Sequence, residues 1–170
     1  MGDNKDNLEI ERKFLLRNTP VFPNGENSDR TPVKRLLIHQ VYIEIDGIVN
    51  RYRMTEDMRT DERVYHHCIK KVLSPGVFEE IEEEIEKSKF DEVSESTHRY
   101  IIKVRTVYNE NGFNWEIDNY IEMKLVTLEV ELDDINQDIE IPEYIKPLVI
   151  SELTGQKEFS NHSLSTIQEM

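Results

Sequence analysis

The chain has 170 residues, of which 37% are apolar and 33% are charged, and its formal net charge is −14. This length predicts one domain, residues 1–170, with room for a core of its own, and the patterned apolar residues argue against disorder. The acidic charge argues against nucleic acid or an anionic membrane as a partner. Carboxylate oxygens are instead the ligands that Mg²⁺ and Ca²⁺ prefer.

Two further absences in the sequence restrict the setting. No apolar run is long enough to span a membrane, and the N-terminus lacks the apolar segment of a signal peptide. The single cysteine, Cys68, excludes an intramolecular disulfide, so a reducing compartment is the default. We therefore expect a cytoplasmic protein without a membrane partner.

Alternation of apolar and charged residues predicts a first strand over 8–16. Residues 18–32 contain three prolines and a glycine and are expected to form a loop. Asp46-Gly47 and the segment 109–112 are hairpin signals. Further strands are predicted over 35–45, 48–54, 62–72, 77–86, 98–108, 112–121 and 125–132.

Short helices are predicted at three places. One begins near Ser88, whose hydroxyl is suited to cap it, and the others lie near 133–138 and 142–153. Residues 1–7 and 163–170 are expected to be loose ends. About eight hairpin-linked strands and a few short helices give an α+β, mainly β class, and favour a sandwich or a barrel.

The charged residues share faces, because residues two apart in a strand point to the same side. In an ordinary half-exposed sheet such charged faces contact water, and this is a sufficient explanation for the charged face of any single strand. The charged stripes are often of one sign, however, with acids over 80–86, 116–118 and 129–131 and bases over 51–53. Seven apolar faces also cannot share one small core unless the sheet closes or helices cover it. We therefore favour a closed barrel with its charges inside, and its apolar outside packed under loops, a few helices or a second subunit as a homodimer.

Inward charges must be paired or solvated. The inward acids are expected to be Glu9, Glu11, Glu80, Glu82, Glu116, Asp118, Glu129 and Glu131. The inward bases are expected to be Lys13, Arg51, Arg53, Lys70 and Arg99, with Lys103 and Arg105 as further candidates. A metal-bound polyphosphate satisfies both signs, since a divalent ion bridges carboxylates to phosphate oxygens and basic side chains hold the rest.

The charged residues also occur in an ordered series that resembles a known family. The series is Glu9-Ile10-Glu11-Arg12-Lys13 (ExExK), Gln40 and Tyr42, Arg51 and Arg53 (RxR), Ile69-Lys70, Glu80 and Glu82, Arg99-Tyr100, Trp115-Glu116-Ile117-Asp118, Glu129-Val130-Glu131, Glu152-Leu153-Thr154-Gly155 and Phe159-Ser160-Asn161. In this order the chain resembles the CYTH-domain proteins, or triphosphate tunnel metalloenzymes, and among them the short bacterial inorganic triphosphatases.

The resemblance implies an eight-stranded antiparallel closed tunnel that binds a triphosphate with Mg²⁺ or Mn²⁺, as two ions. The metal ligands it implies are Glu9, Glu11, Glu80, Glu82, Asp118, Glu129 and Glu131. The phosphate-binding residues it implies are Lys13, Arg51, Arg53, Lys70 and Arg99. The candidate catalytic residues are Glu82, Asp118 and Lys70.

Some positions depart from the family pattern. Thr97 stands where the family often has a basic residue, and Cys68 stands where threonine is usual. Glu158 replaces a closing arginine, which makes the adjacent Lys157 a candidate phosphate ligand. The acidic run 79–86 leaves the register open, with Glu82 and Glu84 as the alternative pair.

The expected function is metal-dependent hydrolysis of the terminal phosphoanhydride of inorganic tripolyphosphate or a similar triphosphate. The alternatives are an organic triphosphatase acting on thiamine triphosphate or a nucleotide, a class IV-type adenylate cyclase, and a non-catalytic triphosphate-binding module. The five histidines show no HExxH or zinc-finger spacing, so no zinc site is expected, and Cys68 is interpreted as a packed small residue.

Overall fold

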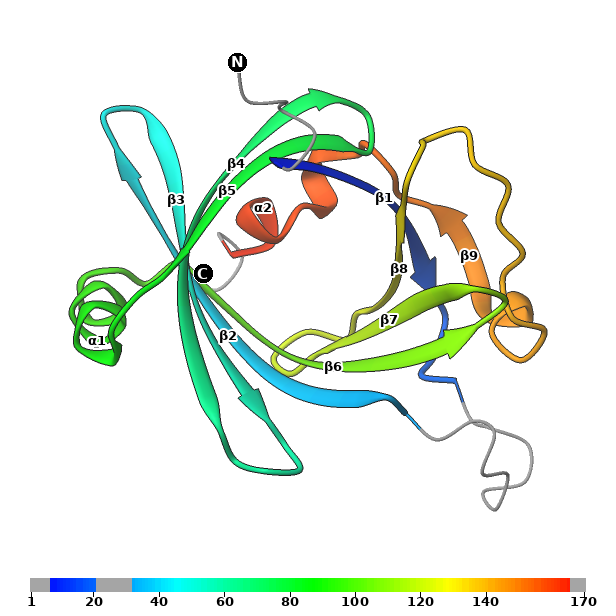
Figure 1. Ribbon diagram of the computed structural model, residues 1–170, viewed down its shortest axis with the longest axis horizontal. Helices are drawn as coiled ribbons and strands as arrows, with labels where there is room; N and C mark the ends of the chain where they lie inside the picture. The colour runs from blue at the N-terminus through cyan, green and yellow to red at the C-terminus, as the bar shows by residue number, and fades with distance from the viewer. Residues whose placement is uncertain (1–6, 21–31, 166–170) are drawn as a thin grey trace.

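Eight antiparallel strands form a closed ring in the computed structural model, which describes residues 7–20 and 32–165 (Figure 1). Around the ring the order is β5-β4-β3-β2-β6-β7-β8-β1, and pairing of β1 with β5 closes it. The eight strands of the ring are β1 (Leu8–Leu16), β2 (Lys34–Ile45), β3 (Ile48–Asp57), β4 (Arg63–Ser74), β5 (Val77–Glu84), β6 (Tyr100–Glu110), β7 (Phe113–Tyr120) and β8 (Val126–Leu132). A ninth strand, β9 (Val149–Glu152), pairs with β1. The predicted closed antiparallel barrel is confirmed.

The strand β9 is where a helix over 142–153 was predicted, and that prediction was wrong. This segment contains a 3₁₀ helix, η3 (Lys146–Leu148), followed by β9. Pro147 lacks the N–H that a longer helix needs. On one edge of β1, β5 pairs only with residues 8–10, so β9 pairs with residues 14–16 of the same edge.

The helix predicted over 133–138 is also absent, and the segment forms bends and a turn. Two side chains bond the backbone there: Gln137 accepts from the N–H of Asp133, and Asp134 accepts from the N–H of Asn136. Such local bonds compete with a helix for the same backbone groups.

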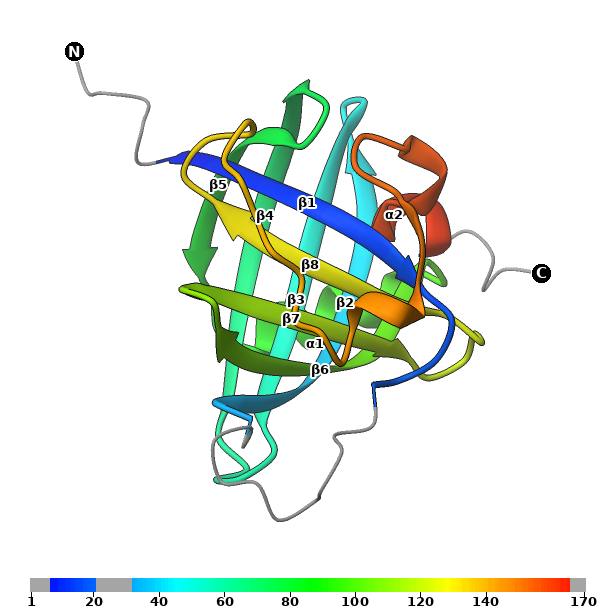
Figure 2. The same cartoon turned by 90° about the vertical axis from the view of Figure 1, so that its right-hand side faces the viewer.

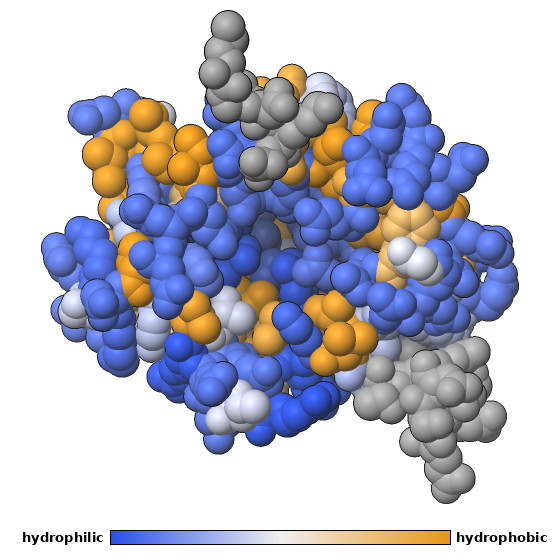
Figure 3. Space-filling model, in the orientation of Figure 1, coloured by the Kyte–Doolittle hydropathy of each residue, from blue (hydrophilic) through white to orange (hydrophobic). Residues whose placement is uncertain are grey.

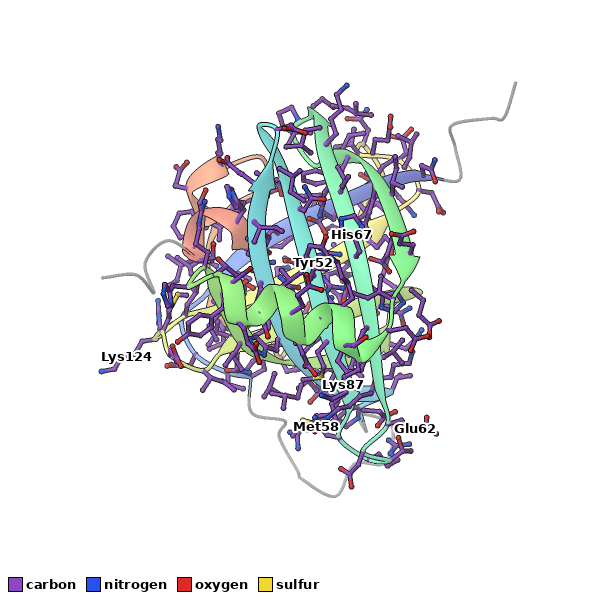
Figure 4. All side chains as sticks on the ribbon, turned by 90° about the vertical axis from the view of Figure 1, so that its left-hand side faces the viewer. Tyr52, Met58, Glu62, His67, Lys87 and Lys124 are labelled. Atoms are coloured by element: carbon purple, nitrogen blue, oxygen red, sulfur yellow. The ribbon has the colours of Figure 1, made fainter. Side chains whose placement is uncertain are left out.

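The predicted helix near Ser88 is confirmed as α1 (Lys87–Ser96), although Ser88 does not cap it. It begins one residue earlier, after Glu86, and no side chain caps its N-terminus. Phe90 and Val93 bury the apolar side of α1 against the outer face of the barrel. Figure 4 shows α1 lying across β3 and β4, below the stacked rings of Tyr52 and His67, whose centroids are 4.6 Å apart.

The apolar side chains pack outside the ring, as the sequence predicts. The largest cluster lies between the outer faces of β1, β7 and β8 and the segment 139–149. Trp115, Leu128 and Val130 of this cluster are fully buried. Burial of apolar area there and under α1 supplies the stabilisation that a charged interior does not.

The C-terminal helix α2 (Asn161–Ser165) follows a 3₁₀ turn, η4 (Lys157–Phe159), and lies at one end of the ring (Figures 1 and 2). Leu164 packs there against Tyr42, Ile101 and Tyr120. The first three residues of the segment 163–170, which was expected to be loose, therefore belong to α2. Figure 3 looks into the ring from the opposite end and shows a hollow whose visible walls are mostly hydrophilic.

Other expectations fall on residues 1–6, 21–31 and 166–170, which lie outside the described residues. Among the described residues, no helix is long and apolar enough to cross a membrane. Val72 and Ile81 are exposed on β4 and β5, at 67% and 55% of their surface. A homodimer that covers such residues stays a prediction.

Candidate active site

Two neighbouring strands, β1 and β8, put acids and a lysine into the tunnel. Lys13 is the cross-strand partner of Glu129, and Glu11 is the partner of Glu131. The Lys13 Nζ lies 3.6 Å from the Glu129 Oε1, and these side chains are only 11% and 7% exposed. Lys13 also donates a hydrogen bond of 2.8 Å to the carbonyl oxygen of Phe159, just before α2.

Lys70 of β4 completes an acidic group with β1. Its Nζ is 3.4 Å from an oxygen of Glu9 and 3.4 Å from an oxygen of Glu11. Burial, with repulsion from Glu129, raises the pKa of Glu11 to about 8. Burial also raises the pKa of Glu9. One ammonium therefore does not neutralise this wall, and the wall can accept further positive charge.

A third acidic pair comes from β5. The Arg51 Nη2 is 3.1 Å from Glu82 and 3.8 Å from Glu80. Glu82 and Glu84 share this face and both are exposed, but the Arg51 guanidinium contacts Glu80 and Glu82, so the structure brings these two together as a pair. Cys68 lies between β3 and β5, as the cross-strand partner of both Arg51 and Glu82. Burial raises the pKa of the Cys68 thiol to about 11.

Arg53 is a half-buried cation of β3 that no described carboxylate contacts directly. Its Nε donates to the side-chain oxygen of Gln40 at 2.9 Å, and Gln40 in turn donates to the hydroxyl of Tyr42 at 2.8 Å. It forms no ion pair with any residue that the structure describes. Burial, with repulsion from Arg51 and Arg105, lowers the pKa of Arg53 to about 10. An anion placed beside these three guanidinium groups would relieve that repulsion.

The strands β6 and β7 form the most densely paired wall. Arg105 faces Asp118 across the strands and binds it with two bonds of 2.8 and 2.9 Å. It also reaches Glu116 at 2.7 Å. The Lys103 Nζ is 2.9 Å from the second oxygen of Asp118, and both side chains are 0% exposed. Although burial opposes it, Arg105 and Lys103 hold the pKa of Asp118 below its ordinary value.

The basic residues of β6 inside the ring are thus Lys103 and Arg105. The sequence assigned phosphate binding to Arg99 and left the other two as further candidates. Arg99 precedes β6 and lies at the α2 end, where it donates to the carbonyl oxygen of His162 at 3.5 Å. Counting back from the β6–β7 hairpin places Arg105 opposite Asp118, and this signal was available in the sequence. The role of Arg99 stays a prediction.

Two other assigned residues lie apart from these groups. Lys157 is exposed in η4 and forms no ion pair with a described residue. Glu131 is exposed at the end of the β8 row. Partial desolvation of its carboxylate, with the nearby charge of Glu9, raises its pKa. Both assignments stay predictions.

The acids of β1 and β8 fit a hard divalent cation. One oxygen of Glu9 is buried, forms no hydrogen bond with a described residue and lies 3.4 Å from the Lys70 Nζ. Glu11 and Glu129 extend the same wall, and all three offer the carboxylate oxygens that Mg²⁺ and Mn²⁺ prefer.

Comparison with known proteins supports the fold. No family model matches the chain, and no curated protein matches its sequence. Among solved structures, the inorganic triphosphatase NE1496 is 24% identical, with a TM-score of 0.57 over 92% of this chain and 93% of that one. The PH1819 protein from Pyrococcus horikoshii is 14% identical, with a TM-score of 0.59 over 95% of this chain and 99% of that one.

A third solved structure is HpAC1 from Hippeastrum, for which a dominant triphosphatase activity is described. It is 19% identical, with a TM-score of 0.50 over 74% of this chain and 80% of that one. This is the fold of the CYTH-domain proteins, the triphosphate tunnel metalloenzymes. The resemblance that the ordered motifs predicted is confirmed at the level of the fold. In this closed barrel the acids and bases come from several strands and meet inside one ring.

Proposed function

We propose that the protein is a metal-dependent triphosphatase that hydrolyses the terminal phosphoanhydride of inorganic tripolyphosphate or a similar short chain. The unneutralised guanidinium of Arg53 carries this proposal. It is half-buried and repelled by Arg51 and Arg105, which already contact carboxylates, so an anion beside Arg53 would neutralise the guanidinium that lacks one. A compact polyanion fits that requirement better than a singly charged ligand.

The chemistry of phosphoryl transfer suits such a site. The reaction needs positioning and charge neutralisation more than a strong nucleophile. Arg51, Arg53 and Arg105 would stabilise charge on the phosphoryl oxygens. Lys13 and Lys70 add ammonium groups from the acidic side of the tunnel.

Glu9, Glu11, Glu129 and Glu131 would hold a first Mg²⁺ or Mn²⁺, and Glu80 and Glu82 a second. A bound ion would neutralise phosphate oxygens and acidify a water molecule. Glu82 is the favoured acceptor of the proton of that water, because its side chain is 33% exposed and can reach water. Both oxygens of Asp118 are engaged by Arg105 and Lys103, so we infer that Asp118 positions those cations.

An assay with several substrates tests the proposal. The purified protein is incubated with Mg²⁺ or Mn²⁺ and tripolyphosphate, ATP or thiamine triphosphate, and both orthophosphate and cyclic AMP are measured. We expect orthophosphate from tripolyphosphate well above the other substrates. The Glu9→Gln, Glu11→Gln double variant should lose metal-dependent turnover, whereas Glu62→Gln, on an exposed turn, should keep it. Tight binding without any product would instead indicate a binding module, and cyclic AMP a cyclase.

One feature favours an organic triphosphate as a second candidate substrate. Phe78 lies on the β5 face of Glu80, and the Lys70 Nζ is 4.1 Å from its ring centroid. When Lys70 turns toward phosphate, this ring becomes available to stack on a planar organic group. In the same assay, thiamine triphosphate or ATP would then exceed tripolyphosphate, and Phe78→Leu would remove that advantage.

A further inference from the structure

We propose that Cys68 is a sulfur ligand of a divalent cation held by Glu80 and Glu82, and that this position prefers a thiophilic ion to Mg²⁺. The ion class is Zn²⁺, Co²⁺ or Cd²⁺. This inference rests on the proposed function only for the presence of a divalent cation in the tunnel. It differs from the expectation drawn from spacing in the sequence, which predicted a packed cysteine and no zinc site.

The donors converge from two neighbouring strands. The Cys68 Sγ and one oxygen each of Glu80 and Glu82 all lie within 4.8 Å of one another. Cys68 is the cross-strand partner of Glu82, so its side chain points to the same interior face. A tetrahedral ion holds oxygen and sulfur ligands roughly 3.5 Å apart, which small side-chain rotations reach from this arrangement.

The thiol is placed for a ligand and not for contact with solvent. Cys68 is 1% exposed, and the structure gives its sulfur no hydrogen bond with a described residue. A methyl-sized apolar side chain would serve packing equally well at such a position, but this wall of the tunnel is charged. A sulfur turned toward two carboxylates therefore has a chemical use that packing does not supply.

The donor set decides which ion is favoured. Mg²⁺ takes oxygen ligands, whereas thiolate and imidazole select softer ions such as Zn²⁺. The His66 Nε2 is 4.0 Å from the outer oxygen of Glu82, so a nitrogen donor borders the same group. On coordination the Cys68 thiol gives its proton to solvent, and the sulfur binds as a thiolate.

A positive charge already lies between these carboxylates. The Arg51 Nη2 is 3.1 Å from Glu82 and 3.8 Å from Glu80. The pair therefore tolerates a cation between its two side chains. An ion that takes this position releases the Arg51 guanidinium, which can then turn toward a phosphate group.

Cobalt(II) gives a direct optical test, because a cobalt–thiolate bond absorbs in the near ultraviolet and a cobalt–carboxylate bond does not. Cys68 is the only cysteine of the chain, so the band can report no other residue. The protein is titrated with Co²⁺ in the absence of substrate. We expect a charge-transfer band that saturates at one ion per chain and that Zn²⁺ or Cd²⁺ displaces, whereas Mg²⁺ does not.

Three variants define the site. Cys68→Ser should lose the band and bind Co²⁺ at least about tenfold more weakly, while its affinity for Mg²⁺ changes less than twofold. Glu82→Gln should weaken the band in the same titration. Glu83→Gln is the matched control, since Glu83 points outward and contacts His67, and it should keep the band. Far-ultraviolet circular dichroism confirms that each variant is folded.

The outcomes separate this inference from the proposed function. Saturable Co²⁺ binding without the band overturns the sulfur ligand, even if the protein hydrolyses tripolyphosphate with Mg²⁺. A band that persists in a Glu80→Gln, Glu82→Gln variant overturns the three-donor site. The expected band in a protein that turns over no triphosphate supports this site and contradicts only the proposed function.

Discussion

Replacing Asp118 by asparagine should destabilise the fold more than any comparable change of surface charge. Asp118 is the shared partner of Lys103 and Arg105 in the wall formed by β6 and β7. The change keeps the size of the side chain but removes its charge. Arg105 retains Glu116 at 2.7 Å, whereas Lys103 loses its closest anion while remaining 0% exposed.

The magnitude follows from that imbalance. Breaking a buried ion pair on one side typically costs about 3–5 kcal/mol, because the other charge stays buried. Deprotonation of Lys103 limits this loss, since releasing a lysine proton at pH 7 costs at most about 5 kcal/mol. We therefore expect Asp118→Asn to lower the free energy of unfolding by about 3–5 kcal/mol, a large part of the total of an ordinary domain.

Equilibrium unfolding in urea measures this change, and Trp115, the only tryptophan and fully buried, provides the fluorescence signal. The control is Glu152→Gln, which removes a surface ion pair with Arg12 of 2.7 Å and should cost less than about 1 kcal/mol. If Asp118→Asn does not fold, the Lys103→Met, Asp118→Asn double variant should, because it also removes the lysine charge that the single change leaves unpaired. Equal losses for Asp118→Asn and Glu152→Gln would refute the reasoning.

The dependence of the free energy of unfolding on acidic pH gives a second test of the role of Asp118. The pKa of Asp118 is held below its ordinary value in the folded state. Its contribution to stability is therefore complete above about pH 4, and it is lost as the pH falls through the folded-state pKa. Stability of the asparagine variant should accordingly fall less steeply below pH 4 than that of the unchanged protein.

Three other changes test separate parts of the structure. Arg53→Gln should lower kcat/KM for tripolyphosphate by about tenfold or more, since a hydrogen bond to a charged group is worth roughly 1.5–3 kcal/mol. The control Arg59→Gln, on an exposed turn, should not change it. Equal kcat/KM values for the two variants would argue against the anion site. Burial lowers the pKa of His39, so its contribution to stability is complete above about pH 6.5 and declines at lower pH. His39→Phe should therefore make the free energy of unfolding change less between pH 7 and pH 5. The same dependence on pH in both proteins would contradict this reasoning. Gly76→Ala should lower the melting temperature, because the backbone at Gly76 has φ +78° and the added Cβ would lie 2.7 Å from the carbonyl oxygen of Glu11. An unaltered melting temperature would count against that close approach.

The sequence predicted the faces of the strands well because alternation has a period of two. Glu9, Glu11 and Lys13 share the interior face of β1, and Glu80 and Glu82 share that of β5. Each of these placements needs only the parity of the residue number and one apolar neighbour to define the outside. The charged lumen was therefore predictable before any strand pairing was known.

Depth along the tunnel was not predictable from the same pattern. Arg99 and Arg105 have the same parity, so alternation places both on the interior side. Alternation does not show that Arg105 meets Asp118, which follows from counting back from the β6–β7 hairpin, or that Arg99 reaches His162 near α2. The helix predicted over 142–153 failed for a related reason, since the free edge of β1 that β9 occupies is a property of the closed sheet.

The ion pairs of the tunnel also explain why metal and triphosphate would bind together. Lys70 lies against Glu9, and Arg51 lies against Glu82, so candidate phosphate ligands neutralise candidate metal ligands. A triphosphate that draws the bases away leaves the acids unpaired, and a metal ion bound to the acids releases the bases. Each ligand would therefore lower the free-energy cost of binding the other, and this coupling is reciprocal. The ion pairs that take part in this exchange join residues of different strands, so they form only when the ring closes.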